Sequence, residues 1–145
     1  NTIPTDAKAA GLYMICTLSK HKAEKDGFTD ALMLDYEGKV AESTGSNIFF
    51  VFKGELHTPI PHCFLDGITR QTAISIAEKR GIKVVQRDIY PEEIKDAEEI
   101  FLTGSAVEIN PVRKIDDLEF KVGKVTSMIS DLYLSEVDKN YKINS

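Results

Sequence analysis

Two pairs of short predicted strands, each pair joined by a tight turn, constrain the fold of this 145-residue chain more than any other feature. Residues 31–34 run into a polar turn and residues 40–43 follow it, as expected of two strands of a hairpin. Residues 47–52 and 55–58 flank Lys53-Gly54, a pair typical of a two-residue hairpin turn. Connections this short join antiparallel neighbours, so the sequence predicts a sheet built largely from antiparallel strands.

Helical periodicity alternates with these strands. Apolar residues recur at three- and four-residue steps in three segments, residues 6–25, 70–80 and 124–137. Further short strands and a short helix that begins at Pro91 are expected between them, the strands over residues 83–89, 99–102 and 106–115. No repeat, low-complexity segment or linker divides the sequence. We therefore predict one α+β domain over residues 1–145 rather than a doubly wound parallel sheet.

Charge and apolar runs exclude several classes of partner. The formal net charge of −5 provides no attraction for nucleic acid or an anionic membrane, so neither partner is expected. No apolar run reaches the length of a membrane span, and the first residues lack a signal-peptide pattern. Cys16 and Cys63 lie in apolar surroundings, which favours free thiols in a reducing compartment. We expect a cytoplasmic protein, and the opening residues Asn1-Thr2-Ile3-Pro4 indicate a chain cut from a longer one.

Lys8 stands among small residues at the start of the first predicted helix. A lysine in such a place is usually solvated, and that remains one interpretation. The small neighbours Ala7, Ala9, Ala10 and Gly11 would also admit a large ring beside its amine. A lysine amine becomes a nucleophile when desolvation or nearby positive charge favours its neutral form. Lys8 is therefore a candidate nucleophile.

Glu42 precedes a run of small polar residues that separates two predicted strands. An acidic residue ahead of a turn is usually exposed, but this loop could also wrap closely around a bound ring. We expect Asn47, at the end of the run, to hydrogen-bond the loop backbone, as asparagine commonly does in turns.

Two further segments combine glycine with hydroxyl residues. Gly67-Ile68-Thr69 opens a predicted helix; Thr69 could be its N-cap, or the helix start could bind a phosphate through its backbone amides. Thr103-Gly104-Ser105-Ala106 could be an ordinary turn or could present donors to an anion. The three histidines have no ligand spacing, so no metal site is expected, and the serines lack a base partner for a hydrolase.

Taken in chain order, four motifs resemble the C-terminal domain of the branched-chain amino-acid aminotransferases. These are class IV, fold-type IV enzymes that depend on pyridoxal 5'-phosphate (PLP), and the likeness runs from about Ile3 to Leu134. The four motifs are Ala7-Lys8-Ala9-Ala10-Gly11-Leu12-Tyr13, Ala41-Glu42-Ser43-Thr44-Gly45-Ser46-Asn47-Ile48-Phe49, Leu65-Asp66-Gly67-Ile68-Thr69-Arg70, and Phe101-Leu102-Thr103-Gly104-Ser105-Ala106-Val107-Glu108-Ile109.

The resemblance implies a fold and a domain organisation. The fold would be α+β and α/β-barrel-like, as in the large C-terminal domain of fold-type IV enzymes. The smaller N-terminal domain of the family would be absent from this chain, and active sites in the family are completed across a homodimer interface. By this likeness, residues 1–145 are expected to show little or no transaminase activity alone.

The resemblance also implies roles for individual residues. Lys8 would form the Schiff base with PLP and carry the proton between substrate and cofactor, and Glu42 would pair with the pyridine nitrogen. Tyr13 would hydrogen-bond near the hydroxyl group of the ring.

Phosphate and substrate contacts are implied for the other two motifs. The helix start at Gly67, Ile68 and Thr69 would bind the cofactor phosphate. Ser105 would add a contact to the phosphate, and Ser105 with Ala106 would bind the substrate carboxylate.

The reaction implied is transamination of leucine, isoleucine and valine, with 2-oxoglutarate as the acceptor of nitrogen. D-Amino-acid aminotransferases and aminodeoxychorismate lyases have the same fold and remain alternatives. A non-catalytic fragment that folds and associates through its uncovered surface is a further alternative of a different kind.

Overall fold

The computed structural model describes most of the chain, namely residues 22–28, 30–43, 45–61, 67–104 and 108–144. The predicted helix over residues 6–25 therefore lies mostly outside the described residues. Its last turn, residues 22–25, is helical, and Gly27 follows with a φ of +94°. Within the described ranges, no helix combines the length and apolar character needed to cross a membrane.

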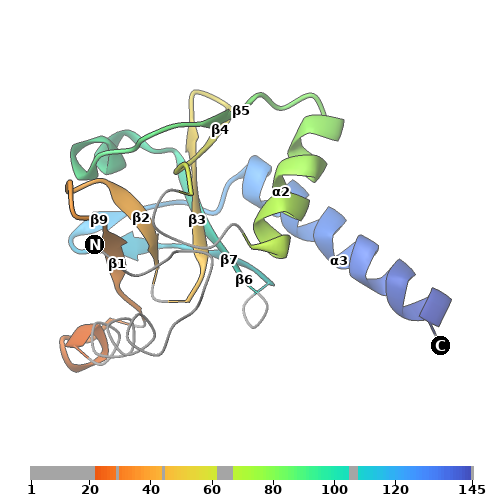
Figure 1. The fold of residues 1–145 in the computed structure, drawn as a ribbon, viewed down its shortest axis with the longest axis horizontal. Coiled ribbons are helices and arrows are strands. Elements are labelled where there is room, and N and C mark those ends of the chain that lie inside the picture. The colour runs from red at the N-terminus through yellow and green to blue at the C-terminus, as the bar shows by residue number, and fades with distance from the viewer. Residues whose placement is uncertain (1–21, 29, 44, 62–66, 105–107, 145) are drawn as a thin grey trace.

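A five-stranded sheet forms the centre of the structure (Figure 1). Its strands, in the spatial order β5-β4-β3-β6-β7, are β5 (Val84–Gln86), β4 (Glu55–Thr58), β3 (Asn47–Phe52), β6 (Glu99–Gly104) and β7 (Glu108–Pro111). The pairs β3–β4, β3–β6 and β6–β7 are antiparallel, whereas β4 and β5 are parallel because a helix connects them. The prediction of a largely antiparallel sheet is confirmed.

Both predicted hairpins are present. β3 and β4 are joined by Lys53-Gly54, whose φ angles of +50° and +76° suit a two-residue hairpin turn. β1 (Leu32–Leu34) and β2 (Val40–Ser43) form a separate two-stranded antiparallel sheet. In their turn, Asp35 Oδ1 accepts a hydrogen bond from the Lys39 amide at 2.9 Å.

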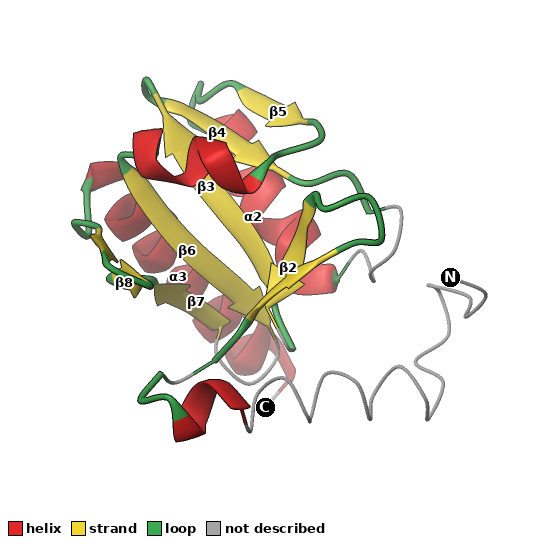
Figure 2. Ribbon diagram, turned by 90° about the vertical axis from the view of Figure 1, so that its left-hand side faces the viewer, coloured by secondary structure: helices red, strands yellow, loops and turns green. Residues whose placement is uncertain are grey.

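Helices α2 (Ile68–Lys79) and α3 (Lys124–Asn144) pack on one side of the sheet, while β1 and β2 lie on the other (Figures 1 and 2). The predicted glycine end of α2 is confirmed. Gly81 has a φ of +78°, and the Ile82 amide donates to the Ala77 carbonyl at 3.0 Å, as in a Schellman motif.

Alternation along the strands divides the core into two clusters, one on each face of the sheet. On the face covered by the helices, Phe49 and Phe101 stack with ring centroids 4.9 Å apart. The buried residues of this cluster are Phe49, Val51, Leu56, Ala73, Ile76, Ala77, Phe101, Ile109, Ile129 and Tyr133. Those of the opposite cluster are Val40, Ile48, Phe50, Ile89, Ile94, Ile100 and Leu102. The mixture of hairpins, a central sheet and helices on one face confirms the predicted α+β class.

The strand predicted over residues 106–115 is present but shorter than expected, as β7, which pairs antiparallel with β6. The Val112 amide still donates to the Ile100 carbonyl at 2.8 Å, and beyond it the chain leaves the central sheet. It then forms a small hairpin of β8 (Lys114–Ile115) with β9 (Leu118–Glu119), turning at Asp116 with a φ of +50°.

Other boundaries also differ from prediction. The strand expected over residues 83–89 is limited to β5, because the chain from Arg87 onward turns toward the β1–β2 hairpin. The short helix at Pro91 is present as the 3-10 helix η1 (Pro91–Asp96). α3 extends to Asn144 rather than ending at residue 137.

Candidate functional site

The turn between β2 and β3 presents the small polar residues that the sequence singled out. The Ser43 amide donates to the Ser46 carbonyl at 2.9 Å, and the Ser43 hydroxyl donates to the same oxygen at 3.2 Å. Glu42 immediately precedes this turn; it is half-buried and lies opposite Met33 of β1. The carboxylate of Glu42 is therefore carried by a paired strand at the edge of the turn.

The start of α2 has the properties of an anion-binding helix end. Gly67 is the N-cap, with extended φ and ψ of −65° and 152°, and it makes no side-chain capping hydrogen bond. No acidic residue lies in the first turn. The first amides of a helix have no partner within the helix, and the helix dipole there favours negative charge. This end of α2 can therefore bind a phosphate or carboxylate through its backbone.

Thr69 is not the N-cap of this helix. The helix begins at Ile68, so Thr69 occupies the second helical position, where a side chain cannot cap the helix. The interpretation of Thr69 as an N-cap is therefore wrong. Its role in binding phosphate stays a prediction.

Asn47 connects the β2–β3 turn to the start of α2. It is buried at the first position of β3, and its Oδ1 accepts a hydrogen bond from the Gly67 amide at 3.3 Å. The two residues are 20 positions apart in sequence. The sequence predicted that Asn47 would bind the backbone of its own loop, and it did not foresee this partner.

The end of β6 also meets the same turn. Asn47 lies opposite Thr103, the neighbour of Gly104. A Cβ atom on Gly104 would lie 2.8 Å from the Ser46 hydroxyl oxygen and 3.4 Å from the Gly45 carbonyl oxygen. A side chain at position 104 would therefore displace the Ser46 hydroxyl where β6 passes the turn. Three of the four motifs are thus brought together at one end of the central sheet.

Arg70 is a residue of this region to which the sequence assigned no role. It stands in the first turn of α2 and is 1% exposed. Its guanidinium donates to the Pro59 carbonyl at 3.1 Å and to Gln86 Oε1 at 2.9 Å, which joins the helix start to the segments after β4 and in β5. The apolar stripe of Ala73 and Ala77 extends back to position 70, and this spacing could have identified Arg70 as buried.

Four predicted site residues lie outside the described residues, namely Lys8, Tyr13, Ser105 and Ala106. Their roles stay predictions. The described part of the site comprises Glu42, Ser43, Gly45, Ser46, Asn47, the start of α2 and the end of β6.

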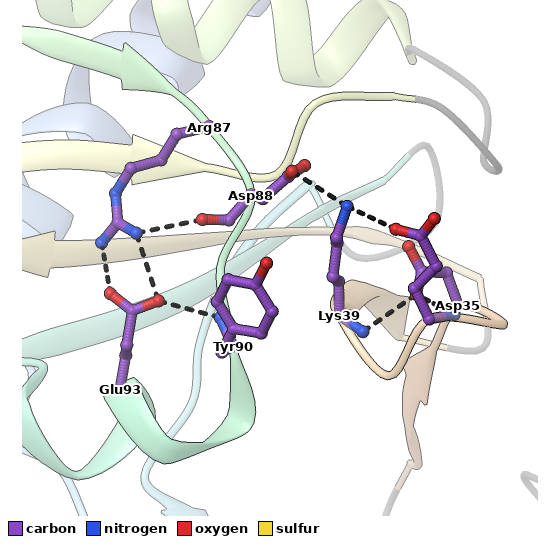
Figure 3. Close-up of polar contacts among 7 residues, drawn as sticks. Asp35, Lys39, Arg87, Asp88, Tyr90 and Glu93 are labelled. Atoms are coloured by element: carbon purple, nitrogen blue, oxygen red, sulfur yellow. Dashed lines mark hydrogen bonds and ion pairs between the residues drawn. The ribbon is translucent and has the colours of Figure 1, made fainter.

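Lys39 lies in a separate polar cluster between the β1–β2 turn and the segment after β5 (Figure 3). Its ammonium group is 2.6 Å from a Glu37 carboxylate oxygen and 3.0 Å from one of Asp88. Hydrogen bonds to these two carboxylates raise the pKa of Lys39. A lysine held protonated in this way is a poor nucleophile, so Lys39 has a structural role.

The same cluster continues to Arg87, which forms a two-pronged ion pair with Glu93 at 2.8 and 3.2 Å (Figure 3). The Arg87 Nε donates to His57 Nδ1 at 2.9 Å. Burial and the Arg87 charge lower the pKa of His57, and the hydrogen bond from Arg87 lowers the pKa of Glu93. These contacts join β4, the segment after β5 and η1.

Comparison with known proteins identifies relatives of this chain. A sequence profile of the family described as amino-transferase class IV matches residues 2–115. A protein of Rickettsia bellii (strain RML369-C), named as a probable branched-chain-amino-acid aminotransferase, is 42% identical over 139 residues. That alignment covers 96% of this chain and 48% of the relative.

Solved structures have the same fold. The branched-chain aminotransferase of Thermoproteus uzoniensis with norvaline superposes with a TM-score of 0.88 and 41% identity, over 91% of this chain and 45% of that one. The enzyme of Thermobaculum terrenum in its PLP form superposes with a TM-score of 0.89 and 40% identity, over 94% and 46% of the two chains. The predicted fold-type IV architecture is confirmed. The chain spans about half the length of the relatives it matches.

Proposed function

This chain belongs to the amino-transferase class IV family, and we propose that the protein of which it is part is a PLP-dependent transaminase for branched-chain amino acids. It would move the amino group of leucine, isoleucine or valine to 2-oxoglutarate. The proposal concerns the protein in its native length, because these residues span about half of the related enzymes.

One observation supports this proposal above the others, namely the construction of the α2 start. Gly67 offers no capping side chain, the first turn contains no acid, and Asn47 and Arg70 hold this helix end against the sheet. Backbone amides so arranged fit the phosphate of PLP. Bound PLP would supply an electron sink for cleavage of a bond at the substrate Cα.

The other predicted residues have roles that match their chemistry. Lys8 would hold the cofactor through its amine, and the same amine would take and return the proton at the substrate Cα. Glu42 would accept a hydrogen bond from the protonated ring nitrogen, and its half-buried position suits a carboxylate that must remain ionised beside a cation. Tyr13 would hydrogen-bond near the ring hydroxyl.

Ser105 and Ala106 would contact the phosphate and the substrate carboxylate. Residues 1–145 would thus provide the cofactor-binding half of the enzyme, with little activity of their own. The homodimer and the cytoplasmic location expected from the resemblance stay predictions.

Chemical trapping of the cofactor tests the proposal directly. The protein in its native length is incubated with PLP, reduced with borohydride and digested for peptide mass spectrometry. We expect a pyridoxyl adduct confined to Lys8 and absent from Lys8→Ala. An adduct spread over surface lysines such as Lys53 and Lys121, or no adduct, would refute the proposed function.

Substrate assays then test the proposed specificity. We expect transfer from L-leucine to 2-oxoglutarate to exceed activity on D-alanine or aminodeoxychorismate by about a hundredfold or more, a range that binding contacts can supply. The opposite preference would support a D-amino-acid aminotransferase or an aminodeoxychorismate lyase. Robust turnover by residues 1–145 alone would refute the expectation that this half is inactive.

A further inference from the structure

The contact between Asn47 and Gly67 lies at the point where the β2–β3 turn meets the start of α2. Asn47 is 5% exposed, and its Oδ1 accepts the Gly67 amide hydrogen at 3.3 Å. Gly67 is the N-cap, so this bond fixes the backbone immediately before the first-turn amides of Ile68 and Thr69. Asn47 therefore acts on the orientation of the helix start without occupying those amides.

The same contact limits the room for a side chain at position 67. Its φ of −65° and ψ of 152° are open to any residue, so the backbone conformation does not require glycine. A Cβ atom at this position would lie 2.8 Å from Asn47 Oδ1, and the next neighbour is Thr69 Oγ1 at 3.7 Å. The Asn47 side chain thus explains why a glycine stands here.

The position of Asn47 also couples the helix start to the rest of the site. Asn47 directly follows Ser46, which closes the turn after Glu42 and approaches Gly104 of β6. A shift of Asn47 would therefore move the helix start relative to Glu42. Arg70 holds the same turn of α2 from the other side, toward β4 and β5.

We propose that Asn47 is a positioning residue that holds the N-terminal amides of α2 at the location required by the cofactor phosphate. This inference rests on the proposed function and adds to it a residue that does not itself contact the phosphate. The Asn47–Gly67 hydrogen bond sets the position of the helix start, and the amides that follow bind the phosphate.

The test compares Asn47→Ala with a matched control, in the protein at its native length. Thr58→Val is the control, because Thr58 is fully buried and its hydroxyl donates to the carbonyl of Ile48, the residue next to Asn47, at 2.8 Å. Each substitution removes a side-chain hydrogen bond to the backbone from the same region. The affinities for PLP and for pyridoxal, which lacks the phosphate, are measured by absorbance titration.

We expect Asn47→Ala to weaken PLP binding about tenfold, the size of one lost hydrogen bond, and to leave pyridoxal binding unchanged. Thr58→Val should lower the melting temperature without changing the ratio of the two affinities. Phosphorus NMR of bound PLP should show a displaced phosphate signal in Asn47→Ala and a native signal in Thr58→Val. Equal ratios in both variants would refute the positioning role.

A double-mutant cycle provides the sharpest test. Gly67→Ala should weaken PLP binding because the added Cβ displaces the Asn47 side chain. This variant provides a second way to disturb the Asn47–Gly67 contact if Asn47→Ala does not fold. In the Asn47→Ala background, Gly67→Ala should have little further effect, because the displaced oxygen is gone. Strictly additive losses would contradict the proposal.

The wild-type protein separates this inference from the proposed function. Failure of the wild type to bind PLP at Lys8 would refute the function and the positioning role together. The other outcome is that the wild type binds PLP at Lys8 and all variants have the same ratio of PLP affinity to pyridoxal affinity. That result would refute the positioning role and leave the proposed function intact.

Discussion

Helices α2 and α3 pack on the same face of the sheet and begin in similar ways. They differ in which backbone amides at the helix start bond to a side chain. Each is preceded by a glycine that lies against a side chain from a β strand. At α3 this side chain is the buried Glu99 of β6, whose carboxylate accepts hydrogen bonds from Val125 at 3.4 Å and Thr126 at 2.8 Å. The carboxylate thus binds the first-turn amides themselves.

At α2 the corresponding side chain is the neutral Asn47, which binds the Gly67 amide ahead of the helix. The first turn of α2 carries neither an acid nor a capping side chain. The comparison indicates that the protein supplies its own anion where a helix start is structural. Where the helix start is proposed to bind a phosphate, it supplies a neutral support instead.

The largest effect is expected from removing the internal anion of α3. Glu99→Ala removes the acceptor of the buried Thr126 amide and the partly buried Val125 amide, so the free energy of unfolding should fall by about 2–3 kcal/mol. Urea denaturation measures this loss, with exposed Glu98→Ala as the control. PLP affinity should stay unchanged, and a parallel loss of affinity would show that the two helix starts are not independent.

A somewhat smaller effect is expected at the glycine before α3. A Cβ atom on Gly123 would overlap the Glu99 side chain, including its Cγ at 2.8 Å. Gly123→Ala should therefore destabilise the protein by about 1–2 kcal/mol through crowding. Combining it with Glu99→Ala should cost less than the sum of the two single losses, as measured by the same denaturation.

An acidic side chain at the start of α2, like that of Glu99 against the start of α3, should change protein stability and PLP affinity in opposite directions. Thr69→Asp places an acid in the first turn of α2, which should stabilise the helix by about 0.5 kcal/mol. The same charge should weaken PLP binding about tenfold, because it repels the phosphate, a cost of about 1.4 kcal/mol. Thr69→Asn serves as the uncharged control. An acid that leaves PLP affinity unchanged would contradict the assignment of α2 as the phosphate helix.

The smallest effect concerns the Arg87 cluster, which lies apart from both helix starts. Because the pKa of His57 is lowered from its ordinary value of 6.5, the unfolded chain takes up the proton first as pH falls. Stability should therefore decline from about pH 6.5 down to the folded pKa of His57, and His57→Gln should flatten this part of the profile.

Glu93 provides an internal reference for that experiment. Its pKa is lowered from 4.5, so its contribution is present above 4.5 and is lost as the pH falls through the folded pKa. This second loss should persist in His57→Gln. Melting temperatures recorded across the pH ranges of His57 and Glu93 check both expected losses of stability. A pH profile that His57→Gln leaves unchanged would contradict the prediction for His57.

Much of the local structure could be predicted because it depends on neighbouring residues. The Lys53-Gly54 turn needs two positive φ angles, and Gly81 terminates α2 by the same freedom. The alternation of Ile48, Phe49 and Phe50 places successive side chains on opposite faces of the sheet.

The wrong boundaries have long-range causes. The strand expected over residues 106–115 is confined to β7, whose bounds depend on its pairing with β6, and that pairing cannot be read from an apolar run. A capping role for Thr69 is one interpretation that the sequence allows, because Ser/Thr caps are frequent, whereas in the structure Gly67 is the N-cap and is held by Asn47.

The sequence by itself determined the α+β class, the hairpins, the order of four motifs and the family that they identify. The resemblance further implied that Glu42, Gly67, Ile68 and Thr69 belong to one site, which stays a prediction. Only the tertiary structure decided which side chain serves which helix, with Asn47 against α2 and Glu99 against α3, and it bonded the buried Arg70 of α2 to Pro59 after β4 and to Gln86 of β5. These contacts join residues 11 to 27 positions apart, and their energies depend on burial, which arises when the sheet and helices pack together.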